Sequence, residues 1–144
     1  MRKHARNAFT LIEILIVVVI MAVLAATIIP QFSSSVDDSK ANQQSFNLHS
    51  LRTQIELYRL QHNGVFPAIT NNLEQLTSRT LVTGVVDSSG TLGPYIFEAI
   101  PDNPITQSNV VTATTTGKNY GGGGWLYNAS TGEIWADQLT NEDD

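Results

Sequence analysis

The stretch from Phe9 to Ile29, FTLIEILIVVVIMAVLAATII, decides the fold of this chain. About 20 predominantly apolar residues cross a bilayer as one helix, because an α-helix rises roughly 1.5 Å per residue. The basic stretch MRKHAR precedes this segment, and a positive flank favours the cytoplasmic side of a membrane. We therefore expect a single-pass helix over residues 9–29, with the N-terminus in the cytoplasm and the rest of the chain outside the inner membrane.

One acidic residue interrupts the apolar segment. Glu13 lies near its start, and an unpaired charge costs roughly 2.5–3.5 kcal/mol at a helix centre and less near an end. Such a residue is a functional candidate and calls for a partner of opposite charge. The alternative is that Glu13 lies at the headgroup level and stays solvated, and spacing alone does not decide between the two.

Two simpler interpretations compete for the same segment. A cleaved secretory signal would use residues 14–22 as its apolar core and residues 23–25 as its cleavage site. Glu13 argues against it, because such cores avoid acids, and the apolar run continues through Ile29. The second alternative is a plain anchor helix that holds an unrelated domain.

Apolar residues recur at steps of three and four beyond the membrane segment, which predicts one face of an amphipathic helix. We expect residues 30–62 to continue the helix and Gly64 to end it, although the polar residues 31–44 leave a flexible linker as an alternative. His49 and His62 are expected to face solvent. The residues of the apolar face are Leu48, Leu51, Ile55 and Tyr58.

Residues 63–144 predict a small head. A short helix is expected from Asn71, because Asn71-Asn72-Leu73-Glu74 has the pattern of a capping box. The fold class is therefore α+β: a long N-terminal helix, of which residues 46–62 pack on a small antiparallel sheet. β-branched composition and turn signals predict the strands. They lie at residues 110–116, 125–128 and 133–137.

Composition excludes several classes of function. Removing the three positive charges of Arg2, Lys3 and Arg6 from a net charge of −5 leaves −8 for the rest, and an acidic body repels nucleic acid. The chain has no cysteine, and its three histidines lack the spacing of metal ligands. No serine stands in a Gly-x-Ser-x-Gly setting, so we expect no enzyme.

The order of the N-terminal parts resembles the type III signal of type IV prepilins and pseudopilins. The resemblance rests on the basic leader, on Asn7-Ala8-Phe9-Thr10-Leu11-Ile12-Glu13, on the apolar run and on Pro30. It implies that a prepilin peptidase cuts between Ala8 and Phe9, so that residues 1–8 form the leader peptide, and that the new amine of Phe9 is N-methylated. The family has glycine where this chain has Ala8, which is also small.

The resemblance also assigns roles within the helix. Glu13 becomes the fifth residue of the mature chain, the acidic position of the family, and would pair with the amine of Phe9 on a neighbouring subunit and set its register. Phe9 and Glu13 are four residues apart and share a helix face. Pro30 corresponds to the proline at which the helix kinks or unwinds in the assembled filament, with a simple helix end at the membrane surface as the alternative.

Later segments resemble, in order, the major pseudopilin of the type II secretion system. This implies a structural filament subunit that helps export folded proteins across the outer membrane. Its partners would be copies of itself, other pseudopilins, the prepilin peptidase, the inner-membrane assembly platform and membrane lipid, and no nucleic acid. The head would lie in the periplasm, and the subunit would pass from the inner membrane into a periplasmic filament. The segments are residues 57–67, 73–76, 93–96 and 100–104.

Two alternatives to this function stay open. One is a type IV pilin for adhesion, motility or DNA uptake. The other, from a different class, is a membrane-anchored periplasmic binding protein or enzyme. Family members of the pseudopilin kind often end in a calcium-binding loop with several acidic ligands, which residues 135–144 do not match. No cofactor is therefore expected, with calcium as the alternative.

Overall fold

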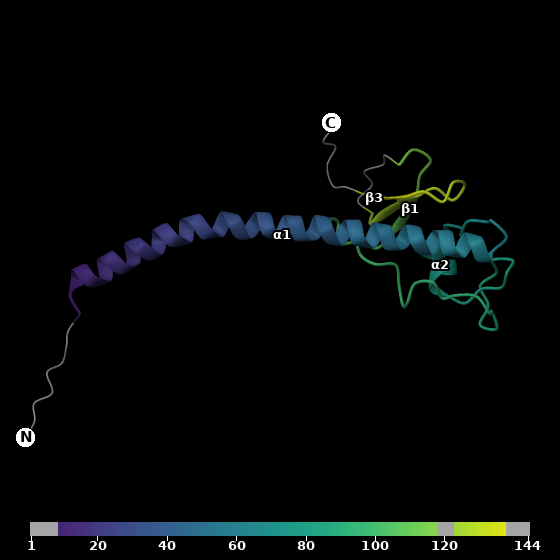
Figure 1. Ribbon diagram of the computed structural model, residues 1–144, viewed down its shortest axis with the longest axis horizontal. Coiled ribbons are helices and arrows are strands. Elements are labelled where there is room, and N and C mark those ends of the chain that lie inside the picture. Colours follow the sequence, from purple (N-terminus) through teal and green to yellow (C-terminus); the bar gives the residue numbers. More distant parts are fainter. Residues whose placement is uncertain (1–8, 118–122, 138–144) are drawn as a thin grey trace, which may run out of the picture. The chain divides into compact units, whose positions relative to one another are not determined.

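The computed structural model describes residues 9–117 and 123–137, with the backbone alone for residues 29–34. The chain divides into two compact units, and the boundary falls between Ser39 and Lys40. The fold class is α+β, as predicted. The elements, in chain order, are helix α1 (Leu11–Gln61), helix α2 (Thr70–Thr77) and strands β1 (Val111–Ala113), β2 (Trp125–Tyr127) and β3 (Ile134–Ala136) (Figure 1).

Helix α1 has 51 residues and contributes to both units. Residues 31–44 are helical throughout, so they do not form the flexible linker considered as an alternative. The helix ends where the backbone becomes left-handed, with φ of 55° at Asn63 and 84° at Gly64. The N–H of Gly64 donates to the carbonyl of Arg59 at 2.9 Å, a bond typical of a helix C-terminus. The predicted end of the helix is confirmed.

The core of the second unit joins one face of α1 to α2 and to the sheet (Figure 1). Leu51, Ile55 and Tyr58 are each 1% exposed, which confirms the predicted face. Burying one such side chain contributes about 1.5–3 kcal/mol, so the head depends on this part of α1. The other members of the cluster are Leu73, Leu76, Ile100, Val111, Trp125, Tyr127 and Ile134.

The three strands form one sheet in the order β1-β2-β3. Strands β2 and β3 lie at two of the predicted positions and pair antiparallel as expected, with Tyr127 opposite Ile134. Strand β1 instead runs parallel to β2, with Val111 opposite Trp125, so the sheet is mixed and the expectation of a purely antiparallel sheet was wrong. Strand propensity carries no information on the direction of a neighbouring strand, because the connection between the strands decides it.

The start of α2 differs from the predicted capping box. Asn71 and Asn72 have left-handed backbone, with φ of 48° and 60°, and Asn71 Nδ2 donates to Glu74 Oε2 at 2.7 Å instead of capping the helix. Asn72 Oδ1 accepts the N–H of Val111 at 2.6 Å, and Asn72 Nδ2 donates to the carbonyl of Asn109 at 3.0 Å. Asn72 therefore bonds to the outer edge of β1 as a neighbouring strand would, and attaches α2 to the sheet.

Asn103 is a fully buried junction within the head. Its Nδ2 donates to the carbonyls of Gly124 at 2.8 Å and Asp137 at 2.9 Å. Its Oδ1 accepts the N–H of Ile105 at 3.0 Å and Nε2 of Gln44 at 2.9 Å. The amide thus uses both donors and both acceptor positions, and it connects α1 to the ends of β2 and β3.

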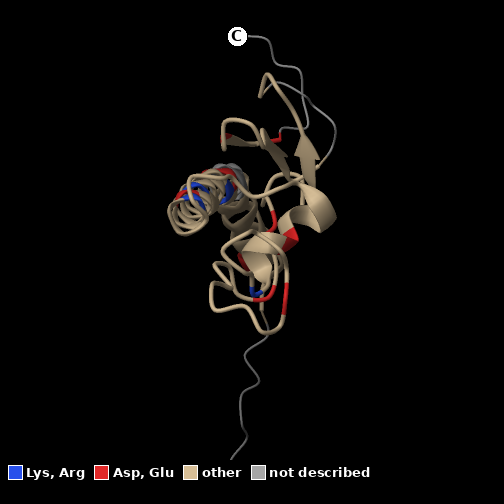
Figure 2. Ribbon diagram, turned by 90° about the vertical axis from the view of Figure 1, so that its right-hand side faces the viewer, with Lys and Arg blue, Asp and Glu red and all other residues tan. Residues whose placement is uncertain are grey.

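Charge is unevenly distributed over the second unit. Figure 2 shows basic residues mainly on α1 and acidic residues spread over the loops and the sheet. Arg52 and Arg59 lie on α1, whereas Asp87, Glu98 and Asp102 lie in the loops between α2 and β1. The helix side of the head is therefore the more positive and the loop side the more negative.

Candidate functional site

The described residues contain one segment that is long and apolar enough to cross a membrane, Leu11–Ile28 of α1. None of this segment is buried within the chain. Leu11 is 85% exposed and Met21, in its middle, is 64% exposed. A continuous apolar surface of this extent needs lipid or protein around it, because water does not solvate it favourably. The segment is the candidate site for membrane insertion and for contact with other helices.

Glu13 caps the N-terminus of its own helix. The N–H and Oγ1 of Thr10 donate to Glu13 Oε2 at 3.1 and 3.0 Å, and the N–H of Glu13 donates to Thr10 Oγ1 at 3.3 Å. This reciprocal pair is a capping box, which the spacing Thr10-x-x-Glu13 indicates but which was not predicted. Among the described residues, the second carboxylate oxygen of Glu13 has no hydrogen-bond partner. One oxygen serves the helix start, and the other is available to a second group.

The predicted cleavage site lies at the edge of the described residues. Ala8 is outside them, and Phe9 is 82% exposed and precedes the start of α1. Cleavage after Ala8 and methylation of Phe9 therefore stay predictions.

Pro30 lies within α1, and the helix is assigned on both sides of it. A proline has no N–H to donate to the carbonyl of Ala26, four residues earlier, so the backbone ladder lacks one bond here. This missing bond is the physical reason for the predicted kink. The structure tests neither a kink at Pro30 nor unwinding of the helix there in a filament, and both stay predictions.

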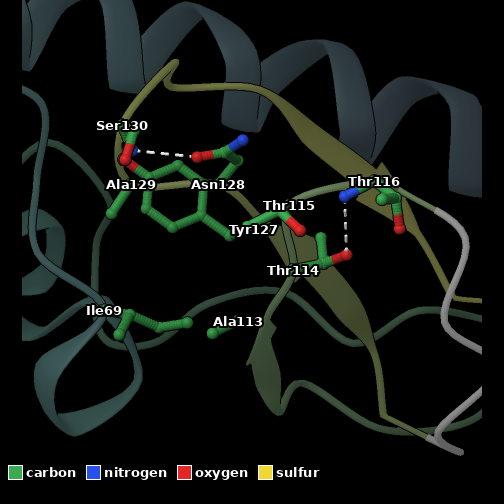
Figure 3. A pocket seen from close by; sticks show the side chains of 9 residues that line it. All are labelled: Ile69, Ala113, Thr114, Thr115, Thr116, Tyr127, Asn128, Ala129 and Ser130. Atoms are coloured by element: carbon green, nitrogen blue, oxygen red, sulfur yellow. Dashed lines mark hydrogen bonds between the residues drawn. The ribbon is translucent and has the colours of Figure 1, made fainter.

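A hollow of about 500 Å³ lies between the end of β1 and the turn that joins β2 to β3 (Figure 3). Its polar groups bond mostly to their neighbours: the N–H of Ser130 donates to Asn128 Oδ1 at 2.9 Å, and the N–H of Thr116 donates to Thr114 Oγ1 at 3.3 Å. The lining has no carboxylate, imidazole or amine, so it supplies no acid–base pair. It consists of Ile69, Ala113, Thr114, Thr115, Thr116, Tyr127, Asn128, Ala129 and Ser130.

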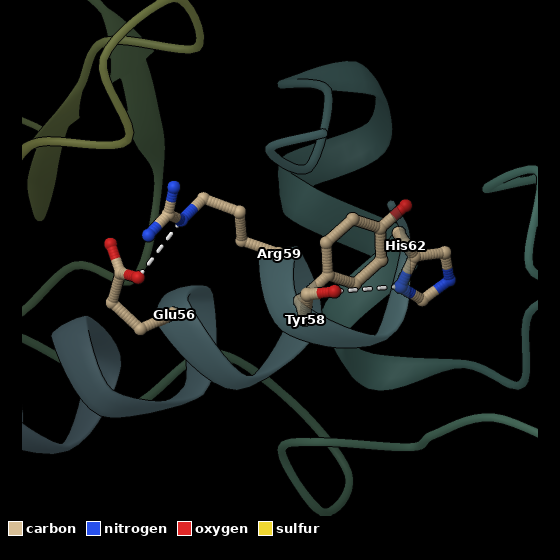
Figure 4. Close-up of polar contacts among 4 residues, drawn as sticks. All are labelled: Glu56, Tyr58, Arg59 and His62. Carbon is tan, nitrogen blue, oxygen red and sulfur yellow. Dashed lines mark hydrogen bonds and ion pairs between the residues drawn. The ribbon is translucent and has the colours of Figure 1, made fainter. Parts of the chain in front are cut away.

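The expectation that His62 faces solvent was wrong, because this residue is 2% exposed, whereas His49 is exposed as predicted. The His62 ring stacks on Tyr58 with 3.7 Å between ring centroids (Figure 4). Its Nδ1 donates to the carbonyl of Tyr58 at 2.8 Å, so its Nε2 accepts the hydroxyl of Thr80 at 3.0 Å in the neutral ring. Both ring nitrogens are therefore used in holding the head together.

No group of three His, Cys, Asp or Glu side chains is placed to hold a metal ion within residues 9–117 and 123–137. The C-terminal end of the chain, from residue 138, is outside this statement. The calcium alternative concerned residues 135–144, and most of these residues lie outside the described part of the chain. Calcium binding is therefore untested.

Comparison with known proteins identifies the N-terminal segment. A family model described as the prokaryotic N-terminal methylation motif matches residues 3–29. The type II secretion system core protein G of Pseudomonas aeruginosa is 33% identical over 79 residues, which cover 55% of this chain and 55% of that protein. The same protein of Klebsiella michiganensis is 28% identical over 82 residues, 57% of each chain. No solved structure matches this chain.

A pilin is also among the similar proteins. The type IV major pilin protein PilE of Neisseria gonorrhoeae is 27% identical over 114 residues, which cover 79% of this chain and 59% of the pilin. The chain spans about half the length of the pseudopilins it matches, 55% in the case of the Pseudomonas protein. The predicted resemblance to type IV pilin-like proteins, and among them to the major pseudopilin, is confirmed.

Proposed function

We propose that this chain is a structural filament subunit, a pseudopilin of a type II secretion system that helps export folded proteins across the outer membrane. The observation that carries the proposal is the methylation motif at residues 3–29, placed on a fully exposed apolar helix that leads into a small α+β head. The similarity to secretion core proteins supports it. A subunit of this kind acts by assembly, and the proposal assigns it no catalytic reaction and no cofactor.

Maturation comes first in this proposal. A prepilin peptidase removes residues 1–8 by cutting between Ala8 and Phe9, and the new amine of Phe9 is N-methylated. The amine keeps its positive charge, since methylation of an amine does not remove it. The mature helix then begins with a cation four residues from Glu13.

Before assembly, the subunit lies in the inner membrane with residues 9–29 in the bilayer, its N-terminus in the cytoplasm and its head in the periplasm. Residues 30–62 continue the helix, and residues 63–144 form the head packed on residues 46–62. The positive leader supports this orientation. The inner-membrane assembly platform and membrane lipid are its partners before assembly, and copies of itself and other pseudopilins are its partners in the filament.

Assembly in this proposal uses the free oxygen of Glu13. A buried amine on one subunit and a buried carboxylate on its neighbour each cost energy alone, and pairing them offsets that cost at one axial register only. The Thr10 capping box holds the carboxylate at the helix start, so its position is set before the neighbour arrives. Pro30 supplies a weak point at which the helix adapts to the filament.

Expression of the full-length chain with and without a prepilin peptidase and a type II secretion assembly system tests the proposal. Mass spectrometry should find a mature protein that starts at methylated Phe9, and sheared fractions should contain filaments. An N-terminus at Ala26 would indicate an ordinary signal peptide instead. Absence of filaments from correctly processed protein would reject the assembly function.

One observation favours a second candidate, a type IV pilin. The similarity to the gonococcal pilin covers 79% of this chain, more than the 55% covered by the similarity to the Pseudomonas core protein. The neighbouring genes distinguish the two candidates. Secretion genes would accompany a pseudopilin, and retraction genes would accompany a type IV pilin. Deletion of the gene should abolish protein export for a pseudopilin, and adhesion, motility or DNA uptake for a pilin.

A further inference from the structure

The outer face of α1 within the head carries apolar residues that the head does not use. At roughly 100° per residue, Leu60 lies about 180° around the helix from the buried Leu51. Leu60 is 74% exposed, and Leu57 on the same side is 40% exposed. An amphipathic helix that serves only its own core carries polar residues at such positions. The folding of the head therefore does not explain these two leucines.

The two leucines line a shallow groove of about 470 Å³, the outer groove, together with Arg52, Thr53 and Glu56. Arg52 Nη2 donates to the carbonyl of Ile134 at 3.1 Å, which holds the guanidinium at the groove. Glu56 is already paired with Arg59 at 3.0 Å (Figure 4). In the described part of the chain no carboxylate lies within salt-bridge distance of Arg52. The outer groove thus combines an apolar surface with a guanidinium that has no direct ion-pair partner among the described residues.

A second exposed apolar feature lies in the loop between α2 and β1, where Phe97 is 83% exposed. The backbone N–H groups of the two preceding residues donate to the carbonyl of Leu76 at 2.8 and 2.9 Å. The N–H of Ala99 donates to the carbonyl of Phe97 at 2.9 Å, with Glu98 between them at φ 66°. Residues 97–99, the Phe97 turn, therefore present an aromatic ring and a carboxylate from a backbone held on both sides, which lowers the entropy lost on binding.

We propose that the Phe97 turn of one copy docks into the outer groove of a second copy. The ring of Phe97 then covers Leu57 and Leu60. The carboxylate of Glu98 meets the guanidinium of Arg52. This inference rests on the proposed filament function and adds to it the surface through which neighbouring heads recognise each other.

Charge and symmetry both support a second copy as the occupant. The groove lies on α1, where the basic residues are concentrated, and the turn lies in the loops, over which acidic residues are spread (Figure 2). Phe97 is 83% exposed, so it does not fill the groove of its own chain. Because the two surfaces differ, each copy still offers a free groove or a free turn after one contact, and such head-to-tail contacts build open filaments.

Disulfide cross-linking tests the contact, because the chain contains no cysteine of its own. The full-length Leu60→Cys, Phe97→Cys double variant is co-expressed with the unmodified chain, so that filaments form, and is oxidised. The double variant should give covalent dimers and higher multimers. Each single variant lacks one of the two cysteines and should give no cross-link between positions 60 and 97. The matched control pairs Leu60→Cys with Val82→Cys, a loop residue that is 50% exposed, and should stay monomeric.

Charge reversal is the second test. Glu98→Arg should lower the filament yield at least about tenfold, as for a central contact residue, and adding Arg52→Glu should restore it. Asp102→Arg, which reverses an exposed loop charge outside the turn, should leave the yield unchanged.

Multimers specific to the Leu60–Phe97 pair, together with rescue by the double charge reversal, support the inference. Normal processing and normal filaments without these multimers overturn it and leave the proposed function intact. An equal yield from the Val82 control, or an adduct with a different protein, also overturns it. If the unmodified chain is neither processed nor assembled, the proposed function fails, and this inference fails with it.

Discussion

Replacing Glu13 by glutamine keeps the length of the side chain and one oxygen acceptor while removing the charge. The Thr10 N–H and hydroxyl, at 3.1 and 3.0 Å from Glu13 Oε2, can still bond to the amide oxygen. A capping box accepts glutamine as well as glutamate, so the helix start should be preserved. The isolated Glu13→Gln subunit is therefore expected to insert and fold normally.

The cost of this substitution should appear in the filament. Breaking a buried ion pair by removing one partner costs about 3–5 kcal/mol, which lowers the association constant of an incoming subunit roughly 150- to 5,000-fold. Loss of the cap alone costs about 0.5–2 kcal/mol, at most roughly 30-fold. The two roles of Glu13 thus differ enough in magnitude to be separated.

The assay compares Glu13→Gln with Thr10→Val in the full-length chain and the native assembly system. Thr10→Val removes the capping hydroxyl, retains the side-chain shape and leaves the charge of Glu13 in place. Membrane fractionation and mass spectrometry follow insertion and processing, and shearing with immunoblotting follows filaments. Glu13→Gln should be inserted and processed but should not assemble, whereas Thr10→Val should assemble with a modest loss.

Normal filaments from processed Glu13→Gln subunits would refute the pairing role. Equal losses in the two variants would also refute it, because they would attribute the effect of residue 13 to the capping of its own helix. Failure of Glu13→Gln to be processed would place the role of the charge before assembly, in recognition by the peptidase, and would likewise contradict a role in pairing between subunits.

Three further predictions concern the stability of the head, measured by denaturant or pH titration of the full-length protein in detergent. Asn103→Leu removes four hydrogen bonds of about 1 kcal/mol each and should lower the free energy of unfolding by about 3–4 kcal/mol. The control, Asn47→Ala, replaces a half-buried asparagine and should cost under about 1 kcal/mol; equal effects would contradict the junction role. His62→Phe keeps the stacking but loses two hydrogen bonds and should cost about 1–2 kcal/mol, against no change for exposed His49→Phe. Burial raises the pKa of the Tyr127 hydroxyl above its usual 10.0, so the unfolded chain releases this proton first and stability should fall as the pH rises past about 10. Burial also raises the pKa of Tyr58 and Tyr95, so Tyr127→Phe should reduce that fall without abolishing it, and an unchanged alkaline profile would disprove the assignment.

The sequence by itself determined the features that depend on neighbours in the chain. A continuous apolar run from Phe9 to Ile29 is insoluble unless it is helical and covered, whatever follows it. The apolar face that begins at Leu48 and the helix end at Gly64 are local signals of the same kind, and both were predicted correctly. The positions of β2 and β3 and their antiparallel pairing were also predicted correctly, because the two strands flank a short turn.

The capping-box pattern occurs near the start of α1 and of α2, and it did not predict correctly at which of them a cap forms. Asn71 and Glu74 matched a capping box and do not form one, while Thr10 and Glu13 form one that went unnoticed within the apolar run. The difference lies in the backbone. Asn71, Asn72 and Leu73 all take a left-handed conformation, and within this turn Asn72 bonds to the edge of β1. A contact distant in sequence overrode the local preference.

Only the tertiary structure decided the rest. The parallel direction of β1 depends on how the chain returns to β2. The burial of His62 depends on Tyr58 and on Thr80, a residue 18 positions later, and the role of Asn103 depends on four partners from different parts of the chain. A polar side chain is stable in a core only when its partners are all in place, and no periodicity in the sequence records where those partners will be.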